Sequence, residues 1–201
     1  MTRTLESLDL PNSLKTLVDI FPTSSIALGG SYARRIIVGA LKGVVVNDID
    51  VYLNASICRY AFVEILKHVV FKGIKIDLPT EKGDTPGDPG YYKMPHMRRR
   101  IQVDFPNGEY PSHDFIFLDP TNVPDVSNFL LNHQASTVSE CAIKIDMVGR
   151  PKAVTSHAFD KVFTRGTSAL LNTHADGCTE AQAAKVRNLC KNNRISLVEF
   201  N

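Results

Sequence analysis

A glycine turn, a helix and an acidic strand follow one another between residues 27 and 53, ALGGSYARRIIVGALKGVVVNDIDVYL, and this combination constrains the fold most strongly. Apolar residues recur at helical spacing after the Gly-Gly pair, which predicts a helix over residues 31–42 with Ser31 as its N-cap. Residues 48–53 alternate between polar and apolar side chains, which predicts a half-buried strand.

Two carboxylates stand at the start of that predicted strand. Asp48 and Asp50 are two residues apart, so the period of a strand places both side chains on the same side. Two like charges this close repel each other, and burial raises the pKa of each. A divalent cation removes that cost, and carboxylate oxygens are good ligands for Mg²⁺. An isolated Asp-x-Asp is more often a solvated strand end, so the neighbouring turn decides the interpretation.

The glycine turn suits a phosphate. Gly29 and Gly30 lack a Cβ, which lets a ligand approach the backbone closely. A helix that begins at Ser31 directs free N–H groups and its positive dipole end at an anion. Arg34 and Arg35 follow one turn later and could pair with phosphate or with the acidic edge of the sheet. A phosphate-binding turn beside two metal-binding carboxylates suits phosphoryl transfer with two ions about 3.5–4 Å apart.

The rest of the chain alternates short helices and strands. A Pro- and Gly-rich segment at residues 79–95 predicts a loop, and no internal repeat is present. The mixed order favours an α+β or α/β fold, in which helices flank a mixed β-sheet. The predicted helices are residues 5–18, 56–73, 123–133, 158–166 and 179–193, and the remaining predicted strands are residues 21–30, 74–78, 98–105, 113–119, 140–149, 151–156 and 194–200.

Composition narrows the class of protein. A hydrophobic fraction of 43% in 201 residues predicts a globular protein, and a net charge of +2 neither requires nor excludes a nucleic-acid partner. No apolar run reaches the roughly 20 residues of a membrane span, and the N-terminal residues lack the apolar core of a signal peptide. We expect a cytoplasmic protein with no membrane partner. Cys178, Cys190 and His174 suggest an incomplete zinc site, and reduced cysteines are the favoured interpretation.

The motif GGSYAR…NDIDVYL resembles the signature of the DNA polymerase β-like nucleotidyltransferase superfamily, in the form found in the head of tRNA CCA-adding enzymes and poly(A) polymerases. HDFIFLD, VPDVSNFLLNH and ECAIKIDMVGRPKAV resemble, more loosely, small and often phage-encoded relatives. The resemblance covers roughly residues 25–165, and its specific motifs occupy the first thirty of them. It implies a mixed sheet with flanking helices. We expect a nucleotidyltransferase core at 1–165 and a small C-terminal extension at 166–201 packed on it.

The resemblance also assigns roles to individual residues. Gly29, Gly30 and Ser31 would hold the triphosphate of a nucleoside triphosphate, together with Arg34. Asp48 and Asp50 would ligate Mg²⁺ or Mn²⁺.

The family usually adds a third carboxylate from a neighbouring strand, which helps to activate the attacking hydroxyl. Asp114, which heads an apolar strand, is the candidate for this catalytic and metal-binding position. Asp104 is the reserve, and Glu140 and Asp146 are weaker alternatives.

Several further residues have both a functional and a structural interpretation. Arg98 to Arg100 could contact a triphosphate or a nucleic-acid backbone, or could form a solvated strand edge. Tyr91 and Tyr92 could stack on a base or cover the core. His113 could tune a proton beside Asp114, although most such histidines have structural roles.

The sequence thus predicts a Mg²⁺-dependent nucleotidyltransferase that moves a nucleoside monophosphate to an acceptor hydroxyl and releases pyrophosphate. The acceptor could be an RNA 3′ end, a protein or a small molecule. An inactive nucleotide- or RNA-binding module with the same fold is the alternative, and a missing third acid would favour it. A structural partner in a larger assembly is a third option. If the chain is phage-encoded, its compartment would be the host cytoplasm.

Overall fold

A computed structural model describes residues 2–4, 12–39, 41–42, 46, 48–78, 94–106, 108, 110–175 and 178–200. Seven strands form one mixed sheet in the order β1-β7-β6-β2-β3-β5-β4. Neighbours in this sheet are antiparallel except β3 and β5, which run parallel. The strands are β1 (Thr2–Thr4), β2 (Ile26–Leu28), β3 (Asp48–Leu53), β4 (Met97–Val103), β5 (Ser112–Leu118), β6 (Cys141–Ile145) and β7 (Pro151–Thr155).

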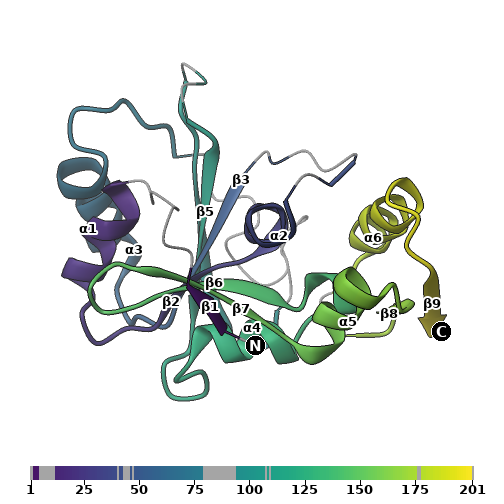
Figure 1. The fold of residues 1–201 in the computed structure, drawn as a ribbon. Helices are drawn as coiled ribbons and strands as arrows, with labels where there is room; N and C mark the ends of the chain where they lie inside the picture. The colour runs from purple at the N-terminus through teal and green to yellow at the C-terminus, as the bar shows by residue number, and fades with distance from the viewer. Residues whose placement is uncertain are drawn as a thin grey trace.

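Alternating side chains give the sheet two apolar faces. On one face, β3 and β5 pack against α1 (Asn12–Ile20), α3 (Arg59–Ile65) and the π-helical turn η1 (Leu66–Val70) that continues α3. On the other face, Tyr52 and Ile116 pack against α4 (Val126–Asn132). The α2 helix (Gly30–Val38) connects β2 to β3 and buries Ala33 in the first of these clusters. Figure 1 shows α1 and α3 on one side of β3 and β5, with α6 on the other.

The C-terminal elements form a third apolar cluster around α5 (His157–Arg165), β8 (Ala169–Asn172) and α6 (Glu180–Asn192). The β8 strand pairs in parallel with β9 (Leu197–Phe200) as a separate two-stranded sheet. Leu171, Val186 and Leu189 are buried there together with Val138 of the 3₁₀ turn η2 (Thr137–Ser139) and Val162 of α5. Residues 166–200 therefore share a core with residues before 166, and a domain boundary at residue 165 stays a prediction.

The mixed α+β architecture is confirmed, but the predicted start and end of the helix after the glycine turn were wrong. The carbonyl of Gly29 accepts the first helical hydrogen bond from Ala33 N at 3.1 Å, so Gly29 is the N-cap and Ser31 lies inside the first turn. The helix ends at Val38, where Gly39 takes φ +91° and its N–H donates to Arg35 O. Ser31 as N-cap and a helix reaching residue 42 were therefore wrong.

Other predicted elements differ in detail. Residues 74–78 form no strand and contribute only an isolated bridge between Asp77 and Asp104. The short strands β1 and β8 were not predicted. Residues 5–11, and most of the predicted loop with Tyr91 and Tyr92, lie outside the described residues. Among the helices that the structure describes, none has both the length and the apolar character to cross a bilayer.

Candidate active site

Three aspartates from two neighbouring strands form the centre of the site. The parallel register of β3 and β5 places Asp50 directly beside Asp114, and Asp48 lies two residues earlier on the same face of β3. One carboxylate oxygen from each residue lies within 4.8 Å of the others. The structure thus brings together the predicted pair and the predicted third acid, which come from segments more than sixty residues apart in the sequence.

Burial makes this group costly to ionise without a cation. Asp114 is 4% exposed, and its Oδ1 is buried with no hydrogen-bond partner among the described residues. Burial, together with the charges of Asp48 and Asp114, raises the pKa of Asp50 to about 7. Burial also raises the pKa of Asp114. Three converging carboxylates, one of which keeps a buried oxygen without a partner among the described residues, fit a hard divalent cation such as Mg²⁺ or Mn²⁺.

The glycine turn lies against these acids. Gly29 N donates to the backbone carbonyl of Asp50 at 3.0 Å. A Cβ on Gly30, which has φ +62°, would stand 1.8 Å from Asp50 Oδ2, and a Cβ on Gly29 would stand 2.6 Å from the ring of Tyr52. Only glycine allows this approach. The N-terminus of α2, where the first N–H groups have no intrahelical partner, therefore begins beside the carboxylates.

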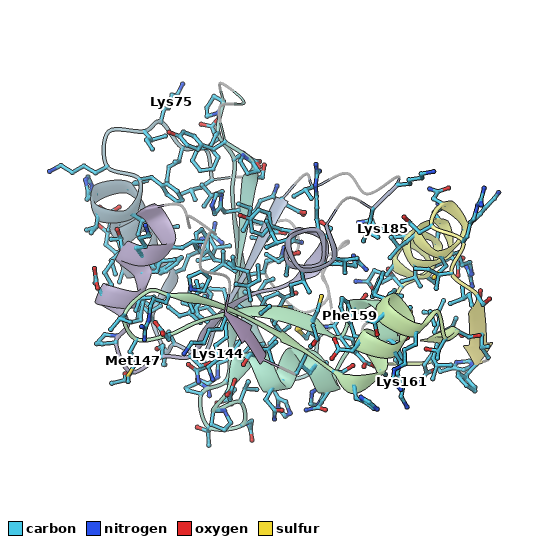
Figure 2. All side chains as sticks on the ribbon, viewed as in Figure 1. Lys75, Lys144, Met147, Phe159, Lys161 and Lys185 are labelled. Atoms are coloured by element: carbon cyan, nitrogen blue, oxygen red, sulfur yellow. The ribbon has the colours of Figure 1, made fainter. Side chains whose placement is uncertain are left out.

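A cleft of about 680 Å³ opens over the acids and the start of α2. Its opposite wall comes from α6 and from the segment between α4 and β6. Figure 2 shows Lys185 on the side of α6 that faces α2. The cleft is thus bounded by elements at both ends of the chain. Its polar lining side chains include Ser31, Arg34, Asp48, Asp50, Arg100, Asp114, Ser136, Ser139, Thr179, Gln182 and Lys185.

Arg34 lines the cleft and also connects α2 to η2 through hydrogen bonds. Its Nη1 donates to Val138 O at 3.2 Å and to Ser139 Oγ at 3.4 Å, while its Nε is buried with no partner among the described residues. Gly30 and Ser31 line the same cleft. Contact between these residues and a nucleotide stays a prediction.

The reserve carboxylates do not join the three aspartates. Among the described residues, Asp48, Asp50 and Asp114 form the only group of three or more side chains able to share a metal ion. Asp104 accepts from Gln102 and bridges to Asp77.

Glu140 and Asp146, the weaker alternatives, are engaged elsewhere. Glu140 accepts from Ser156 Oγ, and Asp146 pairs with Arg150 and Lys152. Among the described residues, no group of side chains able to share a metal ion includes Cys178, Cys190 or His174, so the zinc interpretation has no support there.

His113 lies on the face of β5 opposite to Asp114. Its ring stacks on Phe115 and contacts Phe71 and Phe105 at centroid distances of 5.5 Å. Burial lowers its pKa to about 4. A role for His113 in tuning a proton at the acids was therefore wrong, because successive side chains of a strand point to opposite faces.

The three arginines of β4 have three different partners. Arg98 pairs with Asp119 at 2.8 Å, and Arg99 donates to Ile57 O at 2.9 Å. Arg100 donates to Asp114 Oδ2 at 2.5 Å. The run of three arginines in the sequence does not reveal which of them reaches the acids. Lys185 could not be predicted as a cleft residue either, because nothing in the sequence shows which side of α6 faces α2.

Comparison with known proteins was informative for structure alone. No family model and no curated protein matches the amino-acid sequence. Among solved structures, a Thermotoga maritima CCA-adding enzyme complexed with tRNA has a TM-score of 0.61 and 10% identity over 99% of this chain and 43% of its own. A CCA-adding enzyme with CTP has a TM-score of 0.54 and 13% identity over 85% of this chain and 35% of its own.

A tRNA nucleotidyltransferase with a primer tRNA and an incoming ATP analogue has a TM-score of 0.53 and 11% identity, over 92% of this chain and 46% of its own. This chain has a nucleotidyltransferase fold. It spans less than half the length of each of these three proteins. At this level of identity, the similarity shows the fold alone.

Proposed function

We propose that this protein is a divalent-metal-dependent nucleotidyltransferase, which moves a nucleoside monophosphate from a nucleoside triphosphate to an acceptor hydroxyl. One observation carries the proposal. Asp48, Asp50 and Asp114 converge within 4.8 Å at a point where the glycine turn of α2 touches Asp50. A metal-binding group and a helix N-terminus suited to phosphate therefore share one cleft.

The residues divide between the nucleoside triphosphate and the metal ions. Gly29, Gly30 and Ser31 would bind the triphosphate at the start of α2, with Arg34 nearby. Asp48, Asp50 and Asp114 would hold the ions, which supply charge neutralisation for the phosphates.

The acceptor would bind on the Asp114 side of the cleft. Its oxygen would form a bond to the α-phosphorus while the bond to the β-phosphate oxygen breaks, and pyrophosphate would leave. Asp114 would favour removal of the acceptor proton.

The class of acceptor is suggested by the solved structures to which this chain is similar. Two of the similar structures contain tRNA, and an RNA 3′-hydroxyl is accordingly the acceptor that we propose first. A protein or a small molecule would use the same chemistry. Mg²⁺ as the specific ion, a cytoplasmic location and a compact phage-type enzyme stay predictions.

Transfer of a nucleoside monophosphate to an acceptor tests the proposal. The purified protein is incubated with each nucleoside triphosphate, Mg²⁺ or Mn²⁺, and an RNA oligonucleotide, and transfer is followed with a label on the α-phosphate. We expect metal-dependent transfer that is lost in Asp48→Asn and Asp50→Asn and strongly reduced in Asp114→Asn. Asp146→Asn, which removes a carboxylate from the β6–β7 turn, serves as the matched control. Nucleotide binding without turnover would support the inactive module instead.

A further inference from the structure

The two carboxylate oxygens of Asp114 differ, because one accepts a hydrogen bond from an arginine and the other has no partner among the described residues. Arg100 Nη2 donates to Asp114 Oδ2 at 2.5 Å, whereas Asp114 Oδ1 is buried with no partner among the described residues. A buried acceptor without a donor is unfavourable. The carboxylate therefore has one oxygen neutralised by the protein and a second available for a donor or a cation.

Arg100 is placed differently from its two neighbours on β4. The side chain of Arg98 is 49% exposed and pairs with Asp119, and Arg99 donates to a backbone carbonyl. The side chains of Arg100 and Asp114 are 27% and 6% exposed, so water screens their interaction poorly. Both residues line the cleft with Asp48 and Asp50. Arg100 is thus the β4 arginine whose charge acts within the acidic group.

We propose that Arg100 is a positioning residue that weakens divalent-cation binding until an anionic substrate occupies the cleft. The inference rests on the proposed function for the identity of that substrate, a nucleoside triphosphate or an acceptor phosphate. A guanidinium beside the carboxylates repels an incoming cation, because like charges interact strongly where water is scarce. A bound phosphate gives the guanidinium a second partner, since arginine pairs well with phosphate oxygens.

The consequence is a coupling between the metal and the substrate. If the phosphate offsets the repulsion between Arg100 and the ion, each ligand strengthens the binding of the other by the same factor. Without substrate, Arg100 keeps Asp114 oriented, with Oδ2 occupied and Oδ1 free. The site would then discriminate against a metal ion that arrives alone.

Metal affinity measured without turnover tests this inference. Binding of Mn²⁺ to the full chain is followed by isothermal titration calorimetry, first with no nucleotide present. We expect Arg100→Gln to bind Mn²⁺ about tenfold more tightly than the wild-type protein. Arg98→Gln makes the same charge change on the same strand and should bind Mn²⁺ with the affinity of the wild-type protein. Arg100→Lys keeps the positive charge, so its Mn²⁺ affinity should also stay as low as that of wild type.

A repeat of the titration with a non-hydrolysable nucleoside triphosphate should reduce the difference between Arg100→Gln and wild type. Thermal melting checks the fold of each variant, and Arg100→Met replaces Arg100→Gln if the latter does not fold. Equal or weaker Mn²⁺ affinity in the charge-removing variant would overturn the inference. This result is independent of the proposed function, which fails separately if the wild-type protein releases no pyrophosphate.

Discussion

At the scale of single residues, Gly30 lies where the glycine turn of α2 meets the three aspartates. Its φ of +62° and the 1.8 Å that would separate a Cβ from Asp50 Oδ2 both require glycine. A side chain there would displace Asp50 or the start of α2. Gly39, at the other end of the same helix, also has a positive φ but has open space around it.

We therefore expect Gly30→Ala and Gly39→Ala to have different effects on function. Each variant should lose roughly 1–3 kcal/mol of unfolding free energy in urea, because both positions have a backbone conformation that alanine disfavours. Gly30→Ala should also lose most nucleotidyl transfer, whereas folded Gly39→Ala should keep it. Equal transfer by the two variants would show that the close approach to Asp50 is unimportant.

Asp50 gives a pH dependence to the metal-free protein. Its pKa of about 7 lies above the ordinary aspartate value, so the folded state holds a proton that the unfolded state releases between about pH 4 and 7. Stability therefore falls as the pH rises through this range. We expect Asp50→Asn to melt several degrees above wild type at pH 8 in a chelator and to lose this advantage near pH 4. Mg²⁺ at pH 8 should stabilise wild type more than the variant, and the absence of both effects would contradict the assigned environment of Asp50.

At the scale of elements, the two faces of β5 have different surroundings. Asp114 faces the cleft, and the next residue towards the N-terminus, His113, lies among aromatic rings at 2% exposure. The parallel pairing of β5 with β3 fixes which of these two residues meets Asp50. A shift of one residue in register would exchange them.

His113→Phe should keep the activity and change the acid stability. The histidine pKa of about 4 lies below its ordinary value, so the neutral ring stabilises the fold at high pH, and this stability is lost as the pH falls from about 6.5 through 4. We expect the unfolding free energy of the variant, measured in urea, to lie within about 1 kcal/mol of that of wild type at pH 8. Near pH 4 the variant should be the more stable of the two relative to this difference. A large loss of nucleotidyl transfer in a well-folded variant would show that His113 does contribute to the reaction.

Sequence reasoning succeeded where a local pattern carried the information. The alternation in residues 48–53 and the apolar run after Asp114 were sufficient to predict β3 and β5 and to place Asp48 and Asp50 on one face. The third acid was expected only from the family resemblance, with Asp114 as the candidate and Asp104 as the reserve. β1 and β8 contain three and four residues, too few to show a period. The pairing of Arg100 with Asp114 depends on the register of β4 and β5, which no local pattern reveals. The Ser31 cap was misplaced because the start of α2 depends on a backbone hydrogen bond to Gly29.

At the scale of the whole molecule, the cleft joins segments from opposite ends of the chain. The acids and the glycine turn lie within residues 29–114, while α6 supplies the facing wall. Burial and the charges of Asp48 and Asp114 raise the pKa of Asp50, and the positive charge of Lys185 on the opposite wall acts in the other direction. An anionic ligand in the cleft would therefore meet positive charge from α6.

Lys185→Ala should weaken the binding of a nucleoside triphosphate more than it slows the reaction. Loss of one exposed cation facing a triphosphate should raise KM up to about tenfold with a smaller change in kcat. Lys191→Ala, near the end of the same helix and away from the cleft lining, is the matched control and should leave KM unchanged. The reverse pattern, with kcat reduced and KM constant, would place Lys185 in the reaction instead.

The central claim is that the three aspartates and the glycine turn serve one metal-bound triphosphate. A crystal structure with Mn²⁺ and a non-hydrolysable nucleoside triphosphate, with the ion located by its anomalous scattering, tests this most directly. The account predicts Mn²⁺ bound by Asp48, Asp50 and Asp114 and phosphate oxygens against Gly29, Gly30 and Ser31. A triphosphate bound elsewhere, or Mn²⁺ absent from the three carboxylates at a saturating concentration, would contradict it.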